Sequence, residues 1–342
     1  MRSLRIGFVL LVIFAGAACG SDKSHTPQVL RVDSGSSINE VVQQAKSGDI
    51  VIIAPGTYNE SVKVAVEGIT IRGEDRNTVI LDGQDKLPNG IAVAANGVAI
   101  ENLTVHSYTQ NGVLFNGTEA VAGDKGVDPE IVYGTGDNVL SGFRVSYVTA
   151  YNNGLYGIYA FASRDGLVEH SYVSGHPDSG VYIGQCKPCN TVIRDVTAER
   201  NAIGYYGTNS SGDMYVIEST FINNRLGIAP NSQRAERLAP QGQTVVAGNL
   251  VVDNDDPTAP PIANGYFGVG IAVGGGTENL VIRNRVEGNS AAGIAVISMN
   301  EFLPLGNRIE ENALGGNGID LVYAPDGASD ADNPVIKGPL QM

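Results

Sequence analysis

The sequence predicts an all-β fold, a single-stranded solenoid of the parallel β-helix type, from three observations. A short phrase of glycine followed by an aliphatic or aromatic residue returns at Gly157, Gly180, Gly204 and Gly227, at intervals of 23, 24 and 23 residues. Each phrase follows a polar turn and alternates apolar and other residues with period two, which is typical of strands. No apolar period of 3.6 runs through this stretch. A repeat of this length therefore predicts one coil of strands per repeat.

The same phrase predicts further coils on both sides, beginning at Gly90, Gly112, Gly270, Gly293 and Gly318. Two intervals are long, 45 residues from 112 to 157 and 43 from 227 to 270. Each long interval is expected to hold one coil and an inserted loop. The first insertion covers 116–138, and the second is divided into 231–242 and 253–266 by a strand expected over 244–252. Loops this long in a compact fold are usually functional or disordered, and we expect them to wall a groove on one side.

One helix is expected, over residues 37–46. Ser37 and Glu40 have the spacing of a capping box, in which each side chain accepts a backbone hydrogen bond of the first turn. The apolar residues that follow form one face of the helix: Ile38, Val41, Val42 and Ala45. Because a solenoid must cover its open end, the helix is expected to cap the first coil.

The N-terminus has the pattern of an export signal. Arg2 and Arg5 precede an apolar run over 6–14, and small residues then lead to Cys19. The pattern resembles a bacterial lipoprotein signal, which implies cleavage before Cys19 and a lipid on its sulfur. An ordinary signal peptide cleaved near Ala18 is the alternative. We expect a signal peptide over 1–18, a tether over 19–28 and one β-helix domain over 29–342, in an exported lipoprotein of the bacterial cell membrane or cell surface.

The charge of the chain limits its partners. The formal charge is −14, and removal of Arg2 and Arg5 with the signal makes it −16. Nucleic acid is excluded because phosphate contacts require lysine and arginine. A polysaccharide or other glycan and the membrane are the expected partners of a monomer. No cofactor or metal is assigned, although the aspartates of 325–333 are spaced to suit a hard cation such as Ca²⁺, with a solvated closing turn as the alternative.

Two cysteines stand close together in the stretch Cys186-Lys187-Pro188-Cys189. In an exported protein this spacing favours a local disulfide that staples a loop. A redox motif is the alternative, but it requires a following helix to lower the thiol pKa, and no helical pattern follows. Two cysteines without a pair of histidines do not predict a zinc site.

The opening of the domain carries a recognisable pattern. Residues 48–60 contain Gly48-Asp49, the stretch Pro55-Gly56-Thr57-Tyr58 and Glu60, and residues 69–73 read Ile-Thr-Ile-Arg-Gly. This opening resembles that of right-handed parallel β-helix proteins, among them pectin methylesterases, NosD-like periplasmic proteins and carbohydrate-binding or sugar-hydrolysing β-helices. Residues 154–296 are similar to exported parallel β-helix repeat lipoproteins of bacteria. The resemblance implies a right-handed coil of the pectin lyase-like type and a carbohydrate partner, but no single reaction.

The glycine phrases also predict a binding surface. Side chains alternate along a strand, so the residue after each glycine points inward and the next one points outward. The outward residues of three successive phrases are Tyr159, Tyr182 and Tyr206. Coils stack about 4.8 Å apart, so the three rings are expected to form an exposed strip that can stack on sugar faces. A structural aromatic ladder covered by a loop is the alternative.

Polar residues flank the middle tyrosine. Asp178 and His176 precede it and are the candidate catalytic residues, and Gln185 follows it as a candidate substrate-binding residue beside the tyrosines; a turn residue is the alternative for Asp178. The chain lacks the Asn-Thr-Asp pattern of polygalacturonases, the Asp-Pro-His of mannuronan epimerases and the Arg-x-Pro-x-x-Arg of pectate lyases. The leading hypothesis is therefore glycan binding along the tyrosine face. A polysaccharide lyase, epimerase or glycoside hydrolase at the same face, and a non-catalytic structural or accessory periplasmic protein, are the alternatives.

Overall fold

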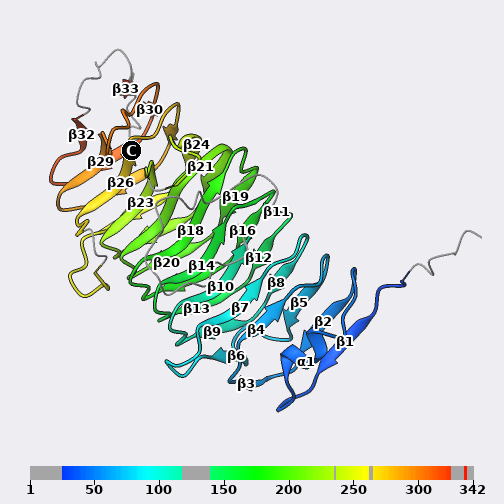
Figure 1. Ribbon diagram of the computed structural model, residues 1–342. Coiled ribbons are helices and arrows are strands. Elements are labelled where there is room, and N and C mark those ends of the chain that lie inside the picture. Colours follow the sequence, from blue (N-terminus) through cyan, green and yellow to red (C-terminus); the bar gives the residue numbers. More distant parts are fainter. Residues whose placement is uncertain (1–24, 118–138, 235, 262–264, 325–334, 337–342) are drawn as a thin grey trace, which may run out of the picture.

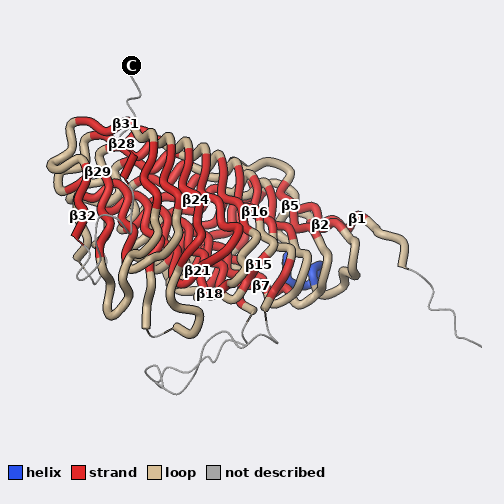
Figure 2. Tube along the Cα trace, turned by 90° about the horizontal axis from the view of Figure 1, so that it is seen from above, coloured by secondary structure: helices blue, strands red, loops and turns tan. Residues whose placement is uncertain are grey.

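A computed structural model describes residues 25–117, 139–234, 236–261, 265–324 and 335–336. The described chain is a stack of coils, and each complete coil adds one strand to each of three parallel sheets, named A, B and C (Figure 1). The chain passes through the sheets in the order A, B, C and then enters the next coil. Figure 2 shows the strands stacked along the length of the molecule, with the helix at the end that begins with β1 and β2. The predicted parallel β-helix is confirmed.

The strands of sheet A are β1 (Val29–Val32), β2 (Ile50–Ile53), β5 (Thr70–Gly73), β8 (Ala99–Glu101), β12 (Arg144–Ser146), β16 (Leu167–Glu169), β19 (Thr191–Arg194), the second half of β21 (Ile203–Ile217), β24 (Gly242–Ala247), β27 (Leu280–Ile282), β30 (Arg308–Glu310) and β33 (Val335–Ile336). The strands of sheet B are β3 (Gly56–Tyr58), β6 (Val79–Asp82), β9 (Thr104–His106), β13 (Thr149–Tyr151), β17 (Tyr172–Ser174), β20 (Thr197–Glu199), β22 (Thr220–Ile222), β25 (Leu250–Val252), β28 (Arg285–Glu287) and β31 (Ala313–Gly315). The strands of sheet C are β4 (Val62–Val64), β7 (Asn89–Val93), β10 (Asn111–Asn116), β14 (Tyr156–Phe161), β18 (Ser179–Cys186), the first half of β21, β23 (Leu226–Asn231), β26 (Val269–Gly274), β29 (Ala292–Ile297) and β32 (Leu321–Ala324). A short pair, β11 (Leu140–Ser141) and β15 (Ser163–Arg164), lies beside them.

Sheet C contains the glycine phrases in the register that the repeat predicts. Ile158 pairs with Val181, Val181 with Tyr205, and Tyr205 with Ile228, and all four side chains are fully buried in the core. An Asp at any of these positions would place a charge in that core without a partner. The inward column of the repeat is therefore the hydrophobic core of the coil.

The last predicted phrase, at Gly318, is wrong by two residues. Ile294 pairs with Leu321 rather than with Ile319, and Ile319 is 56% exposed. Asn317 explains the shift, because its amide donates to the carbonyl of Val286 at 2.9 Å and so holds the turn that precedes the strand. In earlier coils the corner asparagine stands three or four residues before the glycine, as in Asn201–Gly204 and Asn289–Gly293. Asp320, three residues after Asn317, therefore occupies the place of the glycine in this coil.

The helix caps the first coils as predicted but is shorter than predicted. α1 spans Ile38–Val42, with Ser37 as its N-cap and Ile38 and Val42 buried. Glu60, rather than Glu40, completes the cap, because its carboxylate accepts the backbone N–H of Ile38 at 2.7 Å and of the next residue at 3.1 Å. The carboxylate of Asp49 accepts the backbone N–H of Lys46 at 2.8 Å and closes the turn that follows the helix.

Buried asparagines stack at the corners of the coil. At the corner between sheets B and C, the Oδ1 atom of Asn224 accepts both the backbone N–H and the side-chain amide of Asn201, at 2.9 and 3.0 Å. The same contact is repeated from coil to coil, so each buried amide is satisfied by the next. This ladder includes Asn153, His176, Asn201, Asn224, Asn254, Asn289 and Asn317.

The two insertions interrupt the regular spacing of the glycine phrases. Residues 118–138 of the first insertion lie outside the described residues. The strand predicted over 244–252 is two strands, β24 and β25, because Gly248 turns the chain at φ +68° from sheet A into sheet B. Among the described residues, no helix has the length and apolar character needed to cross a membrane.

Candidate functional site

Four tyrosine rings gather on the outer face of sheet C. Tyr159 of β14, Tyr182 of β18 and Tyr206 of β21 are paired in register across three coils, as predicted. The rings of Tyr159 and Tyr182 are stacked at 4.7 Å and 17°, and the ring of Tyr206 meets Tyr182 edge-on at 5.9 Å. Tyr156, at the start of β14, adds a fourth ring 4.5 Å from Tyr159. The rings are therefore packed against one another as well as against the sheet.

The prediction that the whole strip is exposed is wrong. Tyr182 is 4% and Tyr206 is 8% exposed, whereas Tyr159 and Tyr156 are half-buried. A segment from the second insertion, residues 232–234 and 236–241, contacts the rings and is named the covering segment. Its Gln233 donates to the hydroxyl of Tyr206 at 3.5 Å. The sequence showed the outward direction of the rings but not the path of a loop that returns over them.

The covering segment is also bound to polar groups of sheet C. The backbone N–H of Leu238 donates to Oε1 of Gln185 at 3.1 Å, and the amide of Asn209 donates to the carbonyl of Gln233 at 2.8 Å. Gln185 is fully buried by these contacts. It therefore anchors the covering segment and does not present its amide to a substrate, so the structure contradicts its predicted role.

Asp178 lies immediately before β18, at the less covered end of the tyrosine group. Its Oδ2 atom accepts a hydrogen bond of 3.0 Å from the hydroxyl of Tyr156. Its Oδ1 atom is buried and has no hydrogen-bond partner among the described residues. Burial raises the pKa of Asp178 to about 6, against the opposing effect of the hydrogen bond from Tyr156. The carboxyl group can therefore both hold and release a proton near neutral pH.

Glu236 of the covering segment is a second carboxyl group in this place. Its Oε1 atom accepts a hydrogen bond of 3.0 Å from the hydroxyl of Tyr182, and its Oε2 atom lies 3.3 Å from the amide of Asn209. Burial raises the pKa of Glu236 to about 7, although both hydrogen bonds oppose the rise. Glu236 was not predicted, because a single glutamate near two arginines of a polar loop forms no pattern. Only the length of the loop indicated a functional segment.

The two carboxyl groups and the four rings form one unit, named the carboxyl–tyrosine cluster: Tyr156, Tyr159, Asp178, Tyr182, Tyr206 and Glu236. Burial is the main cause of the raised pKa of Tyr206, and the charges of Asp178 and Glu236 both add to it. Burial likewise raises the pKa of Tyr156 and Tyr182. Tyr156, Tyr182 and Tyr206 therefore stay protonated, and the carboxyl groups are the parts of the cluster that can exchange a proton near pH 6–7.

His176 is not a catalytic residue of this cluster, contrary to the prediction. It is fully buried as one step of the asparagine ladder. The amide of Asn153 donates to Nε2 at 3.2 Å, and Nδ1–H donates to Oδ1 of Asn201 at 2.8 Å. Burial lowers the pKa of His176 to about 4, because a second ring proton would face the amide of Asn153. The side chain is a structural, neutral histidine.

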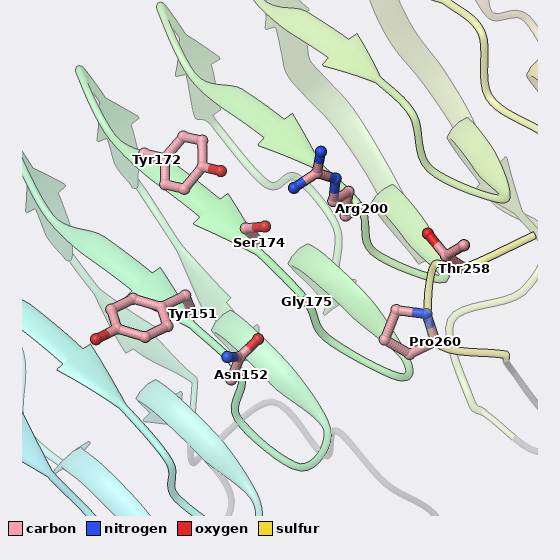
Figure 3. A pocket seen from close by; sticks show the side chains of 8 residues that line it. All are labelled: Tyr151, Asn152, Tyr172, Ser174, Gly175, Arg200, Thr258 and Pro260. Atoms are coloured by element: carbon pink, nitrogen blue, oxygen red, sulfur yellow. The ribbon is translucent and has the colours of Figure 1, made fainter. Parts of the chain in front are cut away.

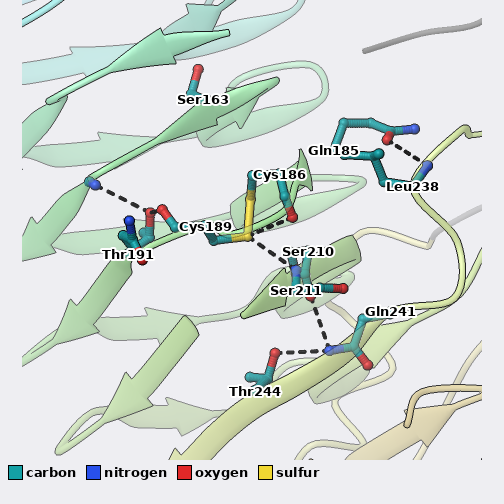
Figure 4. Close-up of a disulfide and its surroundings, with 12 residues drawn as sticks. Ser163, Gln185, Cys186, Cys189, Thr191, Ser210, Ser211, Leu238, Gln241 and Thr244 are labelled. Atoms are coloured by element: carbon teal, nitrogen blue, oxygen red, sulfur yellow. Dashed lines mark hydrogen bonds between the residues drawn. A yellow bond between two sulfur atoms is a disulfide. The ribbon is translucent and has the colours of Figure 1, made fainter. Parts of the chain in front are cut away.

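Cys186 and Cys189 form the predicted disulfide, with an S–S distance of 2.08 Å (Figure 4). The bond closes the turn from sheet C to sheet A, and the backbone N–H of Ser211 in the next coil donates to Sγ of Cys189 at 3.1 Å. The disulfide lies in the turn that follows Gln185 and supports the coil beneath the covering segment.

Three other predictions are not tested by the fold. Cys19 and the signal segment over 1–18 lie outside the described residues, as do the aspartates of the tail over 325–333. Within the described ranges, no group of three or more His, Cys, Asp or Glu residues is arranged to hold a metal ion.

The chain matches the model of the family described as "Right handed beta helix region", over residues 57–249 and 130–314. Its fold is similar to the crystal structure of an alginate lyase from Paenibacillus sp. str. FPU-7, with a TM-score of 0.55 and 14% identity over 87% of this chain and 97% of that one. It is also similar to the pectate lyase Pel9A, with a TM-score of 0.54 and 11% identity over 93% and 82%. The enzymatically active domain of tailspike protein 2 of bacteriophage CBA120 has a TM-score of 0.58 and 12% identity over 90% of this chain and 47% of that one.

No curated protein sequence matches the chain. At these identities the structural likeness establishes the fold alone. The family match covers most of the chain and agrees with the stacked parallel coils. This protein belongs to the family of right-handed parallel β-helix proteins.

Proposed function

We propose that this protein is an exported, lipid-anchored glycan-active β-helix protein, and that it hydrolyses a glycan at the carboxyl–tyrosine cluster of sheet C. The observation that carries the proposal is the pair Asp178 and Glu236. Both carboxyl groups bind a tyrosine hydroxyl of the same aromatic group, and burial brings both pKa values close to neutral pH. Strongly shifted carboxyl groups that meet in one place are a recognised mark of acid–base sites.

The substrate class follows from two further observations. Several proteins of similar fold are named for their action on polysaccharides, namely the alginate lyase, the pectate lyase and the mannuronan C-5 epimerase of Azotobacter vinelandii. The half-buried rings of Tyr156 and Tyr159 stand beside Asp178, where a sugar ring could pack against them. We therefore expect the glycan to bind at the Tyr156 end of the cluster, because the rings of Tyr182 and Tyr206 are covered.

The residues around the carboxyl groups favour hydrolysis over elimination. Elimination from a uronate requires neutralisation of the sugar carboxylate, commonly by lysine, arginine or a metal ion. Within the described part of the chain, no lysine or arginine forms an ion pair or hydrogen bond with Asp178 or Glu236. Hydrolysis requires two carboxyl groups with different proton affinities, one as acid and one as base or nucleophile. The acidic charge of the chain points in the same direction, toward a neutral glycan.

A glycan array followed by product analysis on the purified chain tests this function. Hydrolysis creates new reducing ends without ultraviolet absorbance, elimination creates unsaturated uronate ends that absorb, and epimerisation changes sugar composition without new ends. We expect binding to neutral glycans and new reducing ends only. Binding without any product would leave glycan binding as the function, and the absence of both binding and product would favour an accessory structural role.

The lipid anchor has its own test in cells. Cys19→Ala is expected to remove the protein from the membrane fraction, because the only sulfur at the predicted cleavage site is lost, while the purified domain keeps its melting temperature. Ser21→Ala is the matched control and should leave the protein in the membrane fraction. A Cys19→Ala protein that still sediments with membranes would contradict the lipid anchor.

A further inference from the structure

A hollow lies on the outer face of sheet B, away from the carboxyl–tyrosine cluster of sheet C. It encloses about 420 Å³ and is named the sheet-B hollow (Figure 3). Its size falls within the range of small-ligand pockets, about 300–1,000 Å³. The residues that line it are Tyr151, Asn152, Tyr172, Ser174, Gly175, Arg200, Thr258 and Pro260.

The register of sheet B leaves the faces of two aromatic rings beside the hollow. Tyr151 pairs with His106 in the preceding coil and with Ser174 in the next. The imidazole of His106 covers one side of the Tyr151 ring, at 4.6 Å and 16°. On the other side the paired residue is the small Ser174, and both Tyr151 and Ser174 line the hollow. Tyr172 likewise has the small residue Thr197 at its paired position in the next coil.

Polar groups surround these rings. Arg200 follows β20, and its side chain is 63% exposed at the edge of the hollow. Asn152 and Ser174 come from the coils below it, and Thr258 comes from the loop opposite, as Figure 3 shows. Amide, hydroxyl and guanidinium groups around an aromatic face are the arrangement that binds sugar hydroxyls while the ring packs against the apolar face of the sugar.

The opposite wall of the hollow is held in place before any ligand binds. The carboxylate of Asp256 accepts the backbone N–H and the hydroxyl of Thr258, at 2.7 and 2.6 Å. The guanidinium of Arg225 donates to the carbonyl of Ala259 at 3.3 Å, and Ala259 is buried. A wall that is already ordered reduces the entropy lost on binding.

The charges around Arg200 decide the class of ligand. Glu199 lies 3.8 Å from the guanidinium of Arg200 and accepts a hydrogen bond of 3.1 Å from the hydroxyl of Tyr172. Asp256, which binds Thr258 on the opposite wall of the hollow, is a second carboxylate beside it. One cation is thus balanced by two anions, so a sugar carboxylate would gain little, whereas neutral hydroxyls can donate to the carboxylates and accept from the guanidinium.

We propose that the sheet-B hollow is a second glycan-binding site, specific for a neutral sugar and separate from the site on sheet C. No carboxyl group is among the residues that line it, and the carboxylates beside it, Glu199 and Asp256, are bonded to Tyr172 and Thr258, so it would hold a glycan chain without reacting with it. Binding here does not depend on turnover at the carboxyl–tyrosine cluster. A glycan chain bound at the sheet-B hollow would remain attached to the protein while other parts of the same glycan bind and leave the site on sheet C.

The test is titration calorimetry on the full purified chain, with cellohexaose, mannohexaose and xylohexaose as neutral probes and hexagalacturonate as the acidic probe. We expect at least one neutral probe to bind, Tyr151→Ala to weaken its Kd at least tenfold, and Tyr151→Phe to bind as the wild type does. Arg200→Ala should also weaken binding of the probe. Because the side chain of Arg200 is exposed, its removal should not disturb folding, so this variant tests the site even if Tyr151→Ala folds poorly. Tyr147→Ala is the matched control, because Tyr147 is also stacked on a histidine, at 4.7 Å from His170, but lies outside the hollow.

Three results would overturn the proposal. They are the absence of binding to every neutral probe, equal losses in Tyr151→Ala and Tyr147→Ala, and binding of hexagalacturonate alone. Turnover separates this proposal from the function at sheet C. Loss of binding in Tyr151→Ala with unchanged hydrolysis of short probes supports the hollow even if Asp178 proves inactive. If Asp178→Asn loses turnover while Tyr151→Ala binds the neutral probe with the Kd of the wild type, the proposed binding site at the hollow is refuted and the function at sheet C is not.

Discussion

Asp178→Asn and Glu236→Gln are each expected to lower kcat on the glycan identified by the array by a factor of about 10²–10⁴, the usual contribution of a positioned acid or base. Each change keeps the shape of the side chain and removes only its ability to exchange a proton. Asp178 has the lower pKa, about 6, and is expected to act ionised as base or nucleophile. Glu236, with a pKa of about 7, is expected to act protonated as the acid.

The pH profile assigns these roles. The reactive form has Asp178 ionised and Glu236 protonated, so the rate of the wild-type protein should be greatest between about pH 6 and 7 and fall on both sides. In Asp178→Asn, the residual rate should no longer decrease toward low pH. In Glu236→Gln, the residual rate should no longer decrease toward high pH. A profile that is unchanged in shape in both variants would show that neither group titrates in the reaction.

Stability separates lost chemistry from lost folding. A carboxyl group whose pKa is raised by folding costs stability as pH rises from its unfolded pKa through its folded pKa. Above about pH 7 both carboxyl groups are ionised in the fold at a cost of about 2 kcal/mol each, after allowance for solvent screening of half-buried groups. Both variants should therefore be more stable than the wild type at pH 8 while being less active. Asp195→Asn, a carboxylate at an exposed turn, is the control and should keep full activity.

His176→Asn is expected to make the fold less sensitive to acid. His176 has a pKa of about 4 in the fold and 6.5 when unfolded, so the unfolded chain binds its proton first as pH falls. The stability that depends on the neutral ring is complete above pH 6.5 and is lost between 6.5 and 4, in total about 3 kcal/mol. Asparagine occupies the same ladder position in the described neighbouring coils, cannot be protonated, and removes this loss.

Urea unfolding of wild type and variant at pH 8 and pH 4 measures the effect. At pH 8 the smaller side chain should cost about 1 kcal/mol, and at pH 4 the variant should be the more stable protein. Asp178 and Glu236 titrate in both proteins, so their contributions cancel in the difference between variant and wild type. A difference that does not change with pH would mean that His176 is not held neutral in the ladder.

Much of the fold could be predicted because it repeats. A single stretch of alternating residues that begins with glycine is weak evidence for a strand. The regular spacing of Gly157, Gly180, Gly204 and Gly227 predicts four strands and their register at once, and the structure has them in that register. The error at Gly318 shows the limit of this reasoning. The strand of this coil keeps its distance of a few residues from the corner asparagine rather than from the glycine, because Asn317 is bonded to Val286 and the strand begins at Leu321.

The candidate site could be predicted only in part. Asp178 was found because it stands next to the repeating phrase, and Tyr159, Tyr182 and Tyr206 because outward positions follow from alternation along a strand. His176 and Gln185 were also found next to the phrase, but proximity in sequence does not distinguish a side chain that faces the surface from one that stacks inside a corner. Glu236 is separated from its partner Tyr182 by 54 residues, and no local pattern joins them.

The sequence by itself determined the coil, its core column, the capping helix and the disulfide, because each depends on contacts between residues whose spacing is short or repeats from coil to coil. The tertiary structure alone decided which of the outward tyrosines are covered, which carboxyl group joins Asp178, and where a hollow opens on sheet B. These features depend on where an inserted loop lies once the coils are stacked. A loop path is set by a few side-chain contacts, such as those of Gln185 and Asn209 with the covering segment, which leave no period in the sequence.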